Sequence, residues 1–260
     1  MLLSVVIRTK NQAPALEFLL KNLTQRYADD IDEIVVIDNL STDRSQEVTL
    51  EFGARFETIK EFSYGKSANF AAAKASNPII VIFSAHSYPV SHDFFKLISE
   101  RFKANANLAG LRCLHNSNDY KQYIKGITAS EDPNRSGLIF SGSAFAKAVW
   151  QEYPFREDVA TFEDKEWTNR VLSKGYDIEL VPAIFNYEIK RSKQQELFRY
   201  KNDLKGNYQL WHQEVAIWSG FKGFIATFVR SGIEFVTNIW YALLRLIIII
   251  RFNFKKPKKF

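Results

Sequence analysis

The stretch IIVIFSAHSYP, at residues 79–89, decides how the rest of the chain is arranged. Its first five residues are apolar and mostly β-branched, which is typical of a strand buried on both faces of a sheet. A small polar run and Pro89 follow. We therefore expect this strand to deliver residues 84–88 to its carboxyl end, where open α/β sheets bind their ligands.

Similar strands are expected on both sides of this stretch in the sequence. Apolar runs at 3–7 and 34–37 each end in a polar segment, and a helical pattern of apolar residues follows each of them. Strands and helices alternating at this spacing predict an α/β fold with a mostly parallel sheet and helices on both faces. Asn11 and Asp43 are the expected N-caps of the first two helices.

The second half of the chain is less regular. Residues 108–114 predict another strand, whereas residues 115–136 are polar and have no hydrophobic period. We expect these polar residues to form a long loop or lid. A helix is expected to begin near residue 163, and a strand is expected over residues 176–181.

The charge of the chain is concentrated at its C-terminal end. The net charge of the 260 residues is +6. From residue 221 onward there are eight Lys or Arg and one acid, Glu234, so this segment carries +7 and residues 1–220 carry −1. We expect no nucleic-acid partner, because such a partner needs basic residues spread over a folded face. The tail instead suits a surface of anionic lipid.

Cysteine content and the N-terminus bear on the compartment. Cys113 is the only cysteine, so no disulfide can form within the chain and a reducing compartment is expected. The apolar run at 2–7 is too short for a signal peptide, and Arg8 follows it directly.

The C-terminal region predicts a membrane contact. Residues 221–252 are aromatic and aliphatic, and the run at 233–250 is near the minimum length of a membrane span, but it includes Glu234, Asn238 and Arg245. We expect residues 193–260 to form a helical region whose amphipathic, basic helix attaches the chain peripherally to the cytoplasmic face of the cell membrane. The alternative is a helix packed on the rest of the chain or on a second copy in a homo-oligomer.

Five short motifs occur in a fixed order along the chain. They are SVVIRTKN at 4–11, VIDNLSTD at 36–43, YGKSAN at 64–69, FSAHSYP at 83–89 and FED at 162–164. Together they resemble the signature of family 2 glycosyltransferases with the GT-A fold, and most closely that of rhamnosyltransferase-like members, which build bacterial surface polysaccharide. The resemblance covers roughly residues 2–190. It implies a Rossmann-like GT-A domain at residues 1–192, ahead of the helical region 193–260.

The resemblance also implies a reaction. A sugar would pass, with inversion, from a nucleotide-sugar donor to a hydroxyl of a growing, lipid-linked glycan. In such a transfer a carboxylate deprotonates the acceptor hydroxyl as it attacks the anomeric carbon. By resemblance Asp164 is this base, and Glu163 supports it or contacts the acceptor. Alternatively, both are first-turn acids that complement a helix dipole.

The strand ends supply candidates for binding the donor. Thr9 and Asp38 suit the ribose and the base, with Ser41 in the same motif as Asp38, the alternative for Asp38 being a turn residue. Lys66 stands at a helix start where it could face the diphosphate, the alternative being an ordinary capped helix. Asn69 is the polar residue of that motif that matches the family.

One motif departs from the family pattern. Family members usually carry an Asp-x-Asp-type run after the central strand, whose last carboxylate coordinates a divalent cation. Here Ser84 and His86 take that place, so His86 is the expected ligand of Mg²⁺ or Mn²⁺, or else it contacts the diphosphate directly. Mg²⁺ prefers oxygen ligands, so we expect weaker binding than at a carboxylate site. The missing carboxylates motivate an alternative function, a non-catalytic GT-A domain that binds nucleotide or glycan as a membrane-bound assembly partner.

Overall fold

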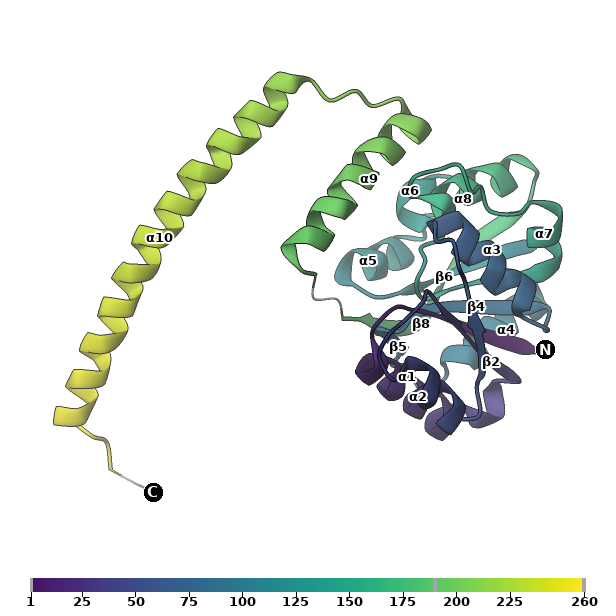
Figure 1. The fold of residues 1–260 in the computed structure, drawn as a ribbon, viewed down its shortest axis with the longest axis horizontal. Coiled ribbons are helices and arrows are strands. Elements are labelled where there is room, and N and C mark those ends of the chain that lie inside the picture. Colours follow the sequence, from purple (N-terminus) through teal and green to yellow (C-terminus); the bar gives the residue numbers. More distant parts are fainter. Residues whose placement is uncertain (1, 189–190, 259–260) are drawn as a thin grey trace. The chain divides into compact units, whose positions relative to one another are not determined.

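The computed structural model describes residues 2–188 and 191–258 (Figure 1). The chain divides into two compact units, Met1–Trp211 and His212–Phe260. In the first unit the helices and strands are β1 (Leu3–Thr9), α1 (Ala13–Arg26), the short 3₁₀ turn η1 (Ala28–Asp30), β2 (Glu33–Asp38), α2 (Ser45–Glu51), β3 (Arg55–Thr58), α3 (Tyr64–Lys74), β4 (Ile79–Ser84), β5 (Ser87–Pro89), α4 (Phe94–Ala104), β6 (Leu108–Leu114), α5 (Ser117–Lys125), α6 (Pro133–Ser136), β7 (Ser143–Ala146), α7 (Lys147–Glu152), α8 (Glu163–Ser173), β8 (Asp177–Tyr187) and α9 (Lys193–Trp211). The second unit contains α10 (Ile217–Phe254).

The strands form one sheet in the order β3-β2-β1-β4-β7-β6-β8-β5. Strands β3, β2, β1 and β4 are all parallel, as is the pair β6 and β8, whereas β7 and β5 run antiparallel to their neighbours. The expected mostly parallel sheet is confirmed. Because β1, β2 and β4 are adjacent and parallel, their polar exits meet at one edge.

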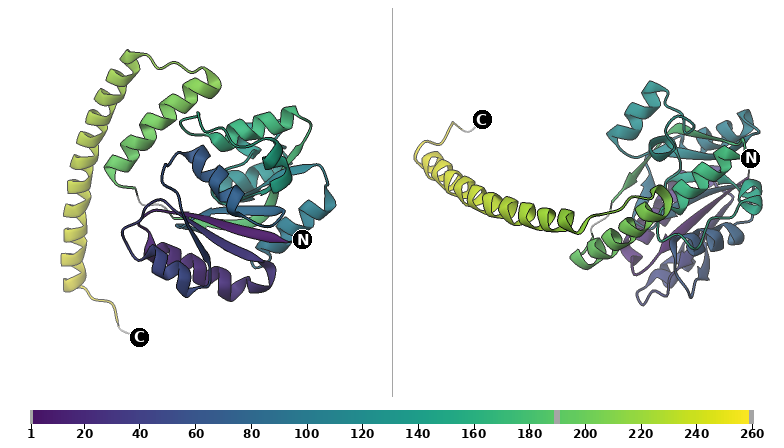
Figure 2. Two further views of the ribbon diagram at one scale, coloured as in Figure 1. Left: turned by 45° about the vertical axis from the view of Figure 1, so that its right-hand side comes forward. Right: turned by 90° about the horizontal axis from the view of Figure 1, so that it is seen from above.

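Strand β4 is buried on both faces, as the composition of residues 79–83 predicts. Residues 79, 81 and 83 of β4 belong to one apolar core, and residues 80 and 82 belong to another. The first core is closed by apolar residues of α1, α2 and α4, and the second by those of α3, α7 and α8. Figures 1 and 2 show the resulting three layers, with α1 and α2 on one side of the sheet and α3, α7 and α8 on the other.

Two local expectations are corrected. Residues 115–136 are not a plain loop, because they contain α5 and α6. Asn11 does not cap α1 with its side chain: its φ is +50° and the backbone N–H of Ala13 instead donates to Asp43 Oδ2 at 2.8 Å. The N-cap of α2 is Arg44 and not the expected Asp43, but the other oxygen of Asp43 accepts from the backbone N–H of Ser45, the first residue of α2. One carboxylate therefore fixes the first turns of both helices.

The first compact unit ends later than the expected boundary after residue 192. Helix α9 belongs to it because Gly206 is buried, and a Cβ at that position would lie 2.7 Å from side-chain atoms of Thr161 and Phe162. The backbone N–H of Ala160 also donates to Gln209 Oε1, at 2.9 Å. Contacts of this closeness attach α9 to the segment that precedes α8.

The expected C-terminal apolar helix is confirmed as α10. It is 38 residues long, and among the described residues it is the single helix long and apolar enough to cross a membrane. None of its most apolar window is buried within the chain. Lys259, part of the expected basic tail, lies outside the described residues.

Candidate active site

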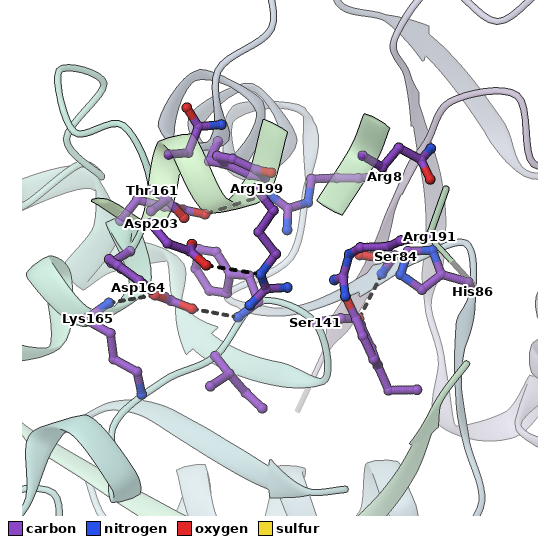
Figure 3. Close-up of a pocket in the computed structure, with 18 of the residues that line it drawn as sticks. Arg8, Ser84, His86, Ser141, Thr161, Asp164, Lys165, Arg191, Arg199 and Asp203 are labelled. Carbon is purple, nitrogen blue, oxygen red and sulfur yellow. Dashed lines mark hydrogen bonds and ion pairs between the residues drawn. The ribbon is translucent and has the colours of Figure 1, made fainter. Parts of the chain in front are cut away.

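A cavity of about 550 Å³ lies at the edge of the sheet where β1 and β4 end (Figure 3). The turn after β4, the segment before β7, the first turn of α8 and one face of α9 complete its walls. Four of the predicted site residues line it: Ser84, His86, Glu163 and Asp164. Its volume is in the range of pockets that bind small molecules and cofactors.

The strand register explains why the remaining strand-end residues lie beside this cavity instead of lining it. Arg8 pairs with Ser84 of β4, and both line the cavity, whereas the next residue, Thr9, pairs with Asp38 of β2. Thr9 Oγ1 and Asp38 Oδ1 are buried and have no hydrogen-bond partner among the described residues. The other oxygen of Asp38 accepts from the backbone N–H of Ser41 at 2.8 Å. Thr9, Asp38 and Ser41 therefore form a cluster with two unsatisfied oxygens, which suits a ligand that supplies N–H or O–H donors.

Lys66 and Asn69 are not brought to the cavity. Lys66 pairs with Glu61 at 2.7 Å, and its backbone N–H donates to Ser63, the N-cap of α3. The structure therefore shows the ordinary capped helix at this position. Asn69 Oδ1 accepts from Trp150 Nε1 and from the backbone N–H of Phe155, both at 2.9 Å, and Nδ2 donates to the Phe155 carbonyl. These bonds make Asn69 a link between α3 and the segment after α7.

The two acids at the start of α8 follow a residue with an unusual backbone conformation. Phe162 has φ +68°, a left-handed value that is costly for a bulky residue and must be held by its surroundings. It is held by α9, because its ring lies 5.2 Å from that of Trp211 and directly against Gly206. The docking of α9 and the direction in which α8 starts are therefore coupled.

Glu163 is buried and lies beside a cation. Its side chain is 5% exposed, and Oε1 lies 3.9 Å from a guanidinium nitrogen of Arg8. Burial is the main reason why the pKa of Glu163 rises to about 7, and the negative charge of Asp164 adds to the rise while Arg8 opposes it. A carboxyl group with a pKa near neutrality can take up or give up a proton under physiological conditions.

Asp164 is held in place by two backbone N–H groups. Oδ2 accepts from Phe140 at 2.9 Å and Oδ1 accepts from Lys165 at 2.7 Å. These two bonds fix the orientation of the carboxylate. The neighbouring Lys165 donates through Nζ to the Gly137 carbonyl at 3.2 Å, and burial lowers the pKa of its ammonium to about 8.

His86 is held on the other side of the cavity. Gln12 Oε1 lies 2.8 Å from Nδ1, and the ring meets Tyr187 edge-on at 4.9 Å between centroids. Burial, followed by the charges of Arg191 and Arg8, lowers the pKa of His86 to about 4. The ring is therefore neutral at physiological pH, and because Nδ1 donates to Gln12 Oε1, Nε2 is an acceptor. This atom is buried and has no partner within the described part of the chain.

These residues do not fit a divalent cation. Within residues 2–188 and 191–258, no group of three or more His, Cys, Asp or Glu side chains is arranged to hold a metal. His86 offers a single nitrogen, and the charges that act on it are those of two arginines. Mg²⁺ and Mn²⁺ favour several oxygen ligands, and nearby guanidinium groups repel cations.

Several residues of the cavity were not singled out from the sequence. Arg8 and Gln12 lie in or next to the first motif, and Lys165 directly follows the acid pair, so proximity to a motif could have identified them. Arg191 and Arg199 carry no local signal, because they reach the cavity through the chain after β8 and through α9. Figure 3 shows Asp164, Lys165 and Asp203 on one side of the cavity and Ser84, His86 and Arg191 on the other.

Comparisons with known proteins agree with this architecture. A family model described as glycosyl transferase family 2 matches residues 4–177. A search of curated proteins finds no significant match. Among solved structures, the chain is similar to a mannosyltransferase, PcManGT, from Pyrobaculum calidifontis in complex with GDP-Man and Mn²⁺, with a TM-score of 0.65 and 18% identity over 82% of this chain and 65% of that one.

Two further solved structures share the fold. Glucosyl-3-phosphoglycerate synthase from Mycobacterium tuberculosis, in complex with Mn²⁺, UDP and glucosyl-3-phosphoglycerate, has a TM-score of 0.59 and 13% identity over 79% of this chain and 78% of that chain. TarS from S. aureus, in complex with UDP-GlcNAc, has a TM-score of 0.57 and 17% identity over 75% of this chain and 61% of that chain. The chain thus spans less than two thirds of the mannosyltransferase and of TarS. At these identities the likeness establishes the GT-A fold.

Proposed function

Because the chain belongs to glycosyl transferase family 2, we propose that it transfers a sugar, with inversion, from a nucleoside-diphosphate donor to a hydroxyl of a growing, lipid-linked surface glycan. The donor sugar is a hexose or a rhamnose-like deoxyhexose. The observation that carries the proposal is the acid pair at the start of α8, which faces the same cavity as the exit of β4.

The chemistry assigned to this pair is a single displacement. The acceptor oxygen attacks the anomeric carbon and its proton passes to a carboxylate oxygen of Asp164, while the bond from the anomeric carbon to the phosphate oxygen breaks and its electron pair leaves with the diphosphate. The two N–H groups on Asp164 fix its carboxylate for this task. Glu163 lies behind it beside Arg8, where it orients the site or contacts the acceptor.

The nucleoside is assigned to the cluster at the ends of β1 and β2. Asp38 Oδ1 is a buried acceptor with no partner among the described residues, which suits the ring N–H of a base or a ribose hydroxyl. Thr9 Oγ1 can serve the same ligand as donor or acceptor. The solved neighbours in complex with GDP-Man, UDP or UDP-GlcNAc support a nucleotide ligand for this fold.

Helix α10 is assigned to the cytoplasmic face of the cell membrane, as a peripheral anchor. At about 100° per residue its five charged residues fall within an arc of about 140°. They are Lys222, Arg230, Glu234, Arg245 and Arg251. A helix of 38 residues is about 57 Å long, nearly twice the thickness of the hydrocarbon layer. A one-sided charged face and this length favour a helix lying in the membrane surface.

The test of the assigned chemistry is Asp164→Asn, which keeps the shape of the side chain and removes the base. We expect turnover to fall by at least about 100-fold, because general-base catalysis contributes factors of this size. Donor binding, measured by calorimetry, should stay within about threefold of the wild type. Asp132→Asn, at the N-cap of α6, is the matched control. Turnover retained in Asp164→Asn would show that this carboxylate is not the base.

A second candidate function is a non-catalytic GT-A domain that binds nucleotide or glycan in a membrane-bound assembly. The specific observation in its favour is the absence of a carboxylate at residues 84–86. Hydrolysis or transfer of a donor by the purified protein would exclude it.

A further inference from the structure

The exit of β4 presents a charge pattern opposite to that of a cation site. The turn contains Ser84, Ala85 and neutral His86, and the two charged side chains that act on His86 are Arg191 and Arg8. The single nitrogen that His86 offers is an acceptor, so it brings no positive charge to a phosphate. Among the described residues, Arg8 and Arg191 are the cations that act on this turn, and they can neutralise an anion there.

Arg8 is fixed in position by several contacts. It donates to Ser67 Oγ at 3.1 Å, lies 3.9 Å from Glu163 and sits over the ring of Phe140 at 5.7 Å. Its side chain is 12% exposed, so its charge acts in a partly desolvated site. A guanidinium held in this way is prepared to bind an anion without reordering.

Arg191 reaches the same region from the other side. It follows β8, is half-buried and lines the cavity together with Ser84 and His86 (Figure 3). It lies beyond residue 177, where the match to the family model ends. Arg199, in contrast, is already paired with Asp203 at 3.4 Å. Arg191 is thus a cation that the C-terminal part of this chain adds to the site.

We propose that Arg8 and Arg191 bind the diphosphate of the donor directly and that this chain needs no divalent cation for donor binding or for departure of the diphosphate. The inference rests on the proposed function. In the displacement described above, the electron pair of the breaking bond is left on the phosphate oxygen, and the two guanidinium groups neutralise that charge through N–H donors. No further reactant is required, because the proton of the acceptor remains on Asp164.

The experiment is calorimetric titration of the full-length protein in detergent with UDP, GDP and dTDP, each in EDTA and each in Mn²⁺. We expect one nucleotide to bind in EDTA, with an affinity that Mn²⁺ changes by less than about threefold. Arg191→Ala should weaken this binding by about tenfold or more, the loss of one charge-assisted contact, and Arg191→Lys should restore part of it. Arg44→Ala, which removes a surface arginine paired with Glu47, is the matched control and should change nothing.

The outcomes separate this inference from the proposed function. Nucleotide binding that requires Mn²⁺ overturns the inference and leaves the proposed function standing. Binding in EDTA that Arg191→Ala leaves unchanged also overturns it. If none of the three nucleotides binds under either condition, both fall. As an independent readout, the paramagnetic resonance spectrum of Mn²⁺ with nucleotide should be the same in the presence and in the absence of the protein.

Discussion

The burial of Glu163 has a consequence for the pH dependence of stability. Its carboxyl group lies beside Asp164 and 3.9 Å from Arg8, and its pKa in the folded protein is about 7 against an ordinary 4.5. Between pH 4.5 and about 7, the folded protein therefore keeps the proton on Glu163, whereas the unfolded protein has released it. Glu163→Gln keeps the shape of the protonated side chain and cannot be ionised.

The sign and size of the effect follow from this pKa. Because the pKa of Glu163 is raised in the folded protein, the contribution of this group to stability is greatest below about pH 4.5. That contribution is lost as the pH rises through about 7. At about 1.4 kcal/mol per pH unit, the full loss is about 3 kcal/mol. Glu163→Gln does not undergo this loss. It should match the wild type at pH 4.5 and exceed its free energy of unfolding by about 3 kcal/mol at pH 8.5.

The assay is urea unfolding of the full-length protein in detergent, followed by tryptophan fluorescence at pH 4.5 and 8.5. Glu100→Gln, an exposed glutamate on α4, is the matched control, for which we expect a difference within about 0.5 kcal/mol at both pH values. If Glu163→Gln is less stable than the wild type at pH 8.5, the ion pair with Arg8 outweighs the cost of burial, and our account of this acid is wrong.

Two further predictions concern α9 and α10. Gly206→Val should lower kcat by about tenfold and leave the affinity for the donor within about threefold, because a Cβ there would displace Phe162 and the acid pair with it. Gly220→Val is its control, since a Cβ there would meet no other element of the described chain within 4 Å. An equal fall in both variants would remove the coupling that we infer. Replacing Lys255, Lys256 and Lys258 with Glu should weaken binding to vesicles of anionic lipid by at least about 100-fold, at about 1 kcal/mol per lysine. The control is the same replacement at Lys60, Lys103 and Lys121, and binding is measured by co-sedimentation with vesicles. Unchanged binding of the tail variant would exclude the tail as the membrane contact.

The sequence predicts strands β1, β2 and β4 well because these strands are buried on both faces of the sheet. Apolar runs such as 79–83 cannot be satisfied on a surface, so their burial and the position of their polar exits follow from composition. Helix α5 was missed although Asn116 caps it and Gly126 ends it with φ +68°. Its apolar residues Tyr120, Tyr123 and Ile124 stand at helical spacing, but three residues are too short a pattern to predict a helix, so the cap signals alone were not decisive.

The site was only partly predictable for a related reason. Residues at strand exits are placed by the sheet, so the sequence predicted that Ser84 and His86 lie at this edge, where they line the cavity, with Asp38 beside it. Asn69 has a side chain of a kind that often binds ligands, but it accepts hydrogen bonds from Trp150 and Phe155, two partners more than 80 residues away in the sequence. Arg191 lines the cavity although it lies outside every motif of the sequence, and no local pattern encodes such a contact.

The central claim is that this chain is a working glycosyltransferase. The most direct measurement is release of nucleoside diphosphate by the full-length protein from UDP-, GDP- and dTDP-sugars, in the presence of lipid extract containing surface-glycan intermediates. We expect one class of donor to be consumed, with the release abolished in Asp164→Asn. A protein that binds a nucleotide but consumes no donor in the presence of this extract would contradict the account and favour the non-catalytic assembly partner.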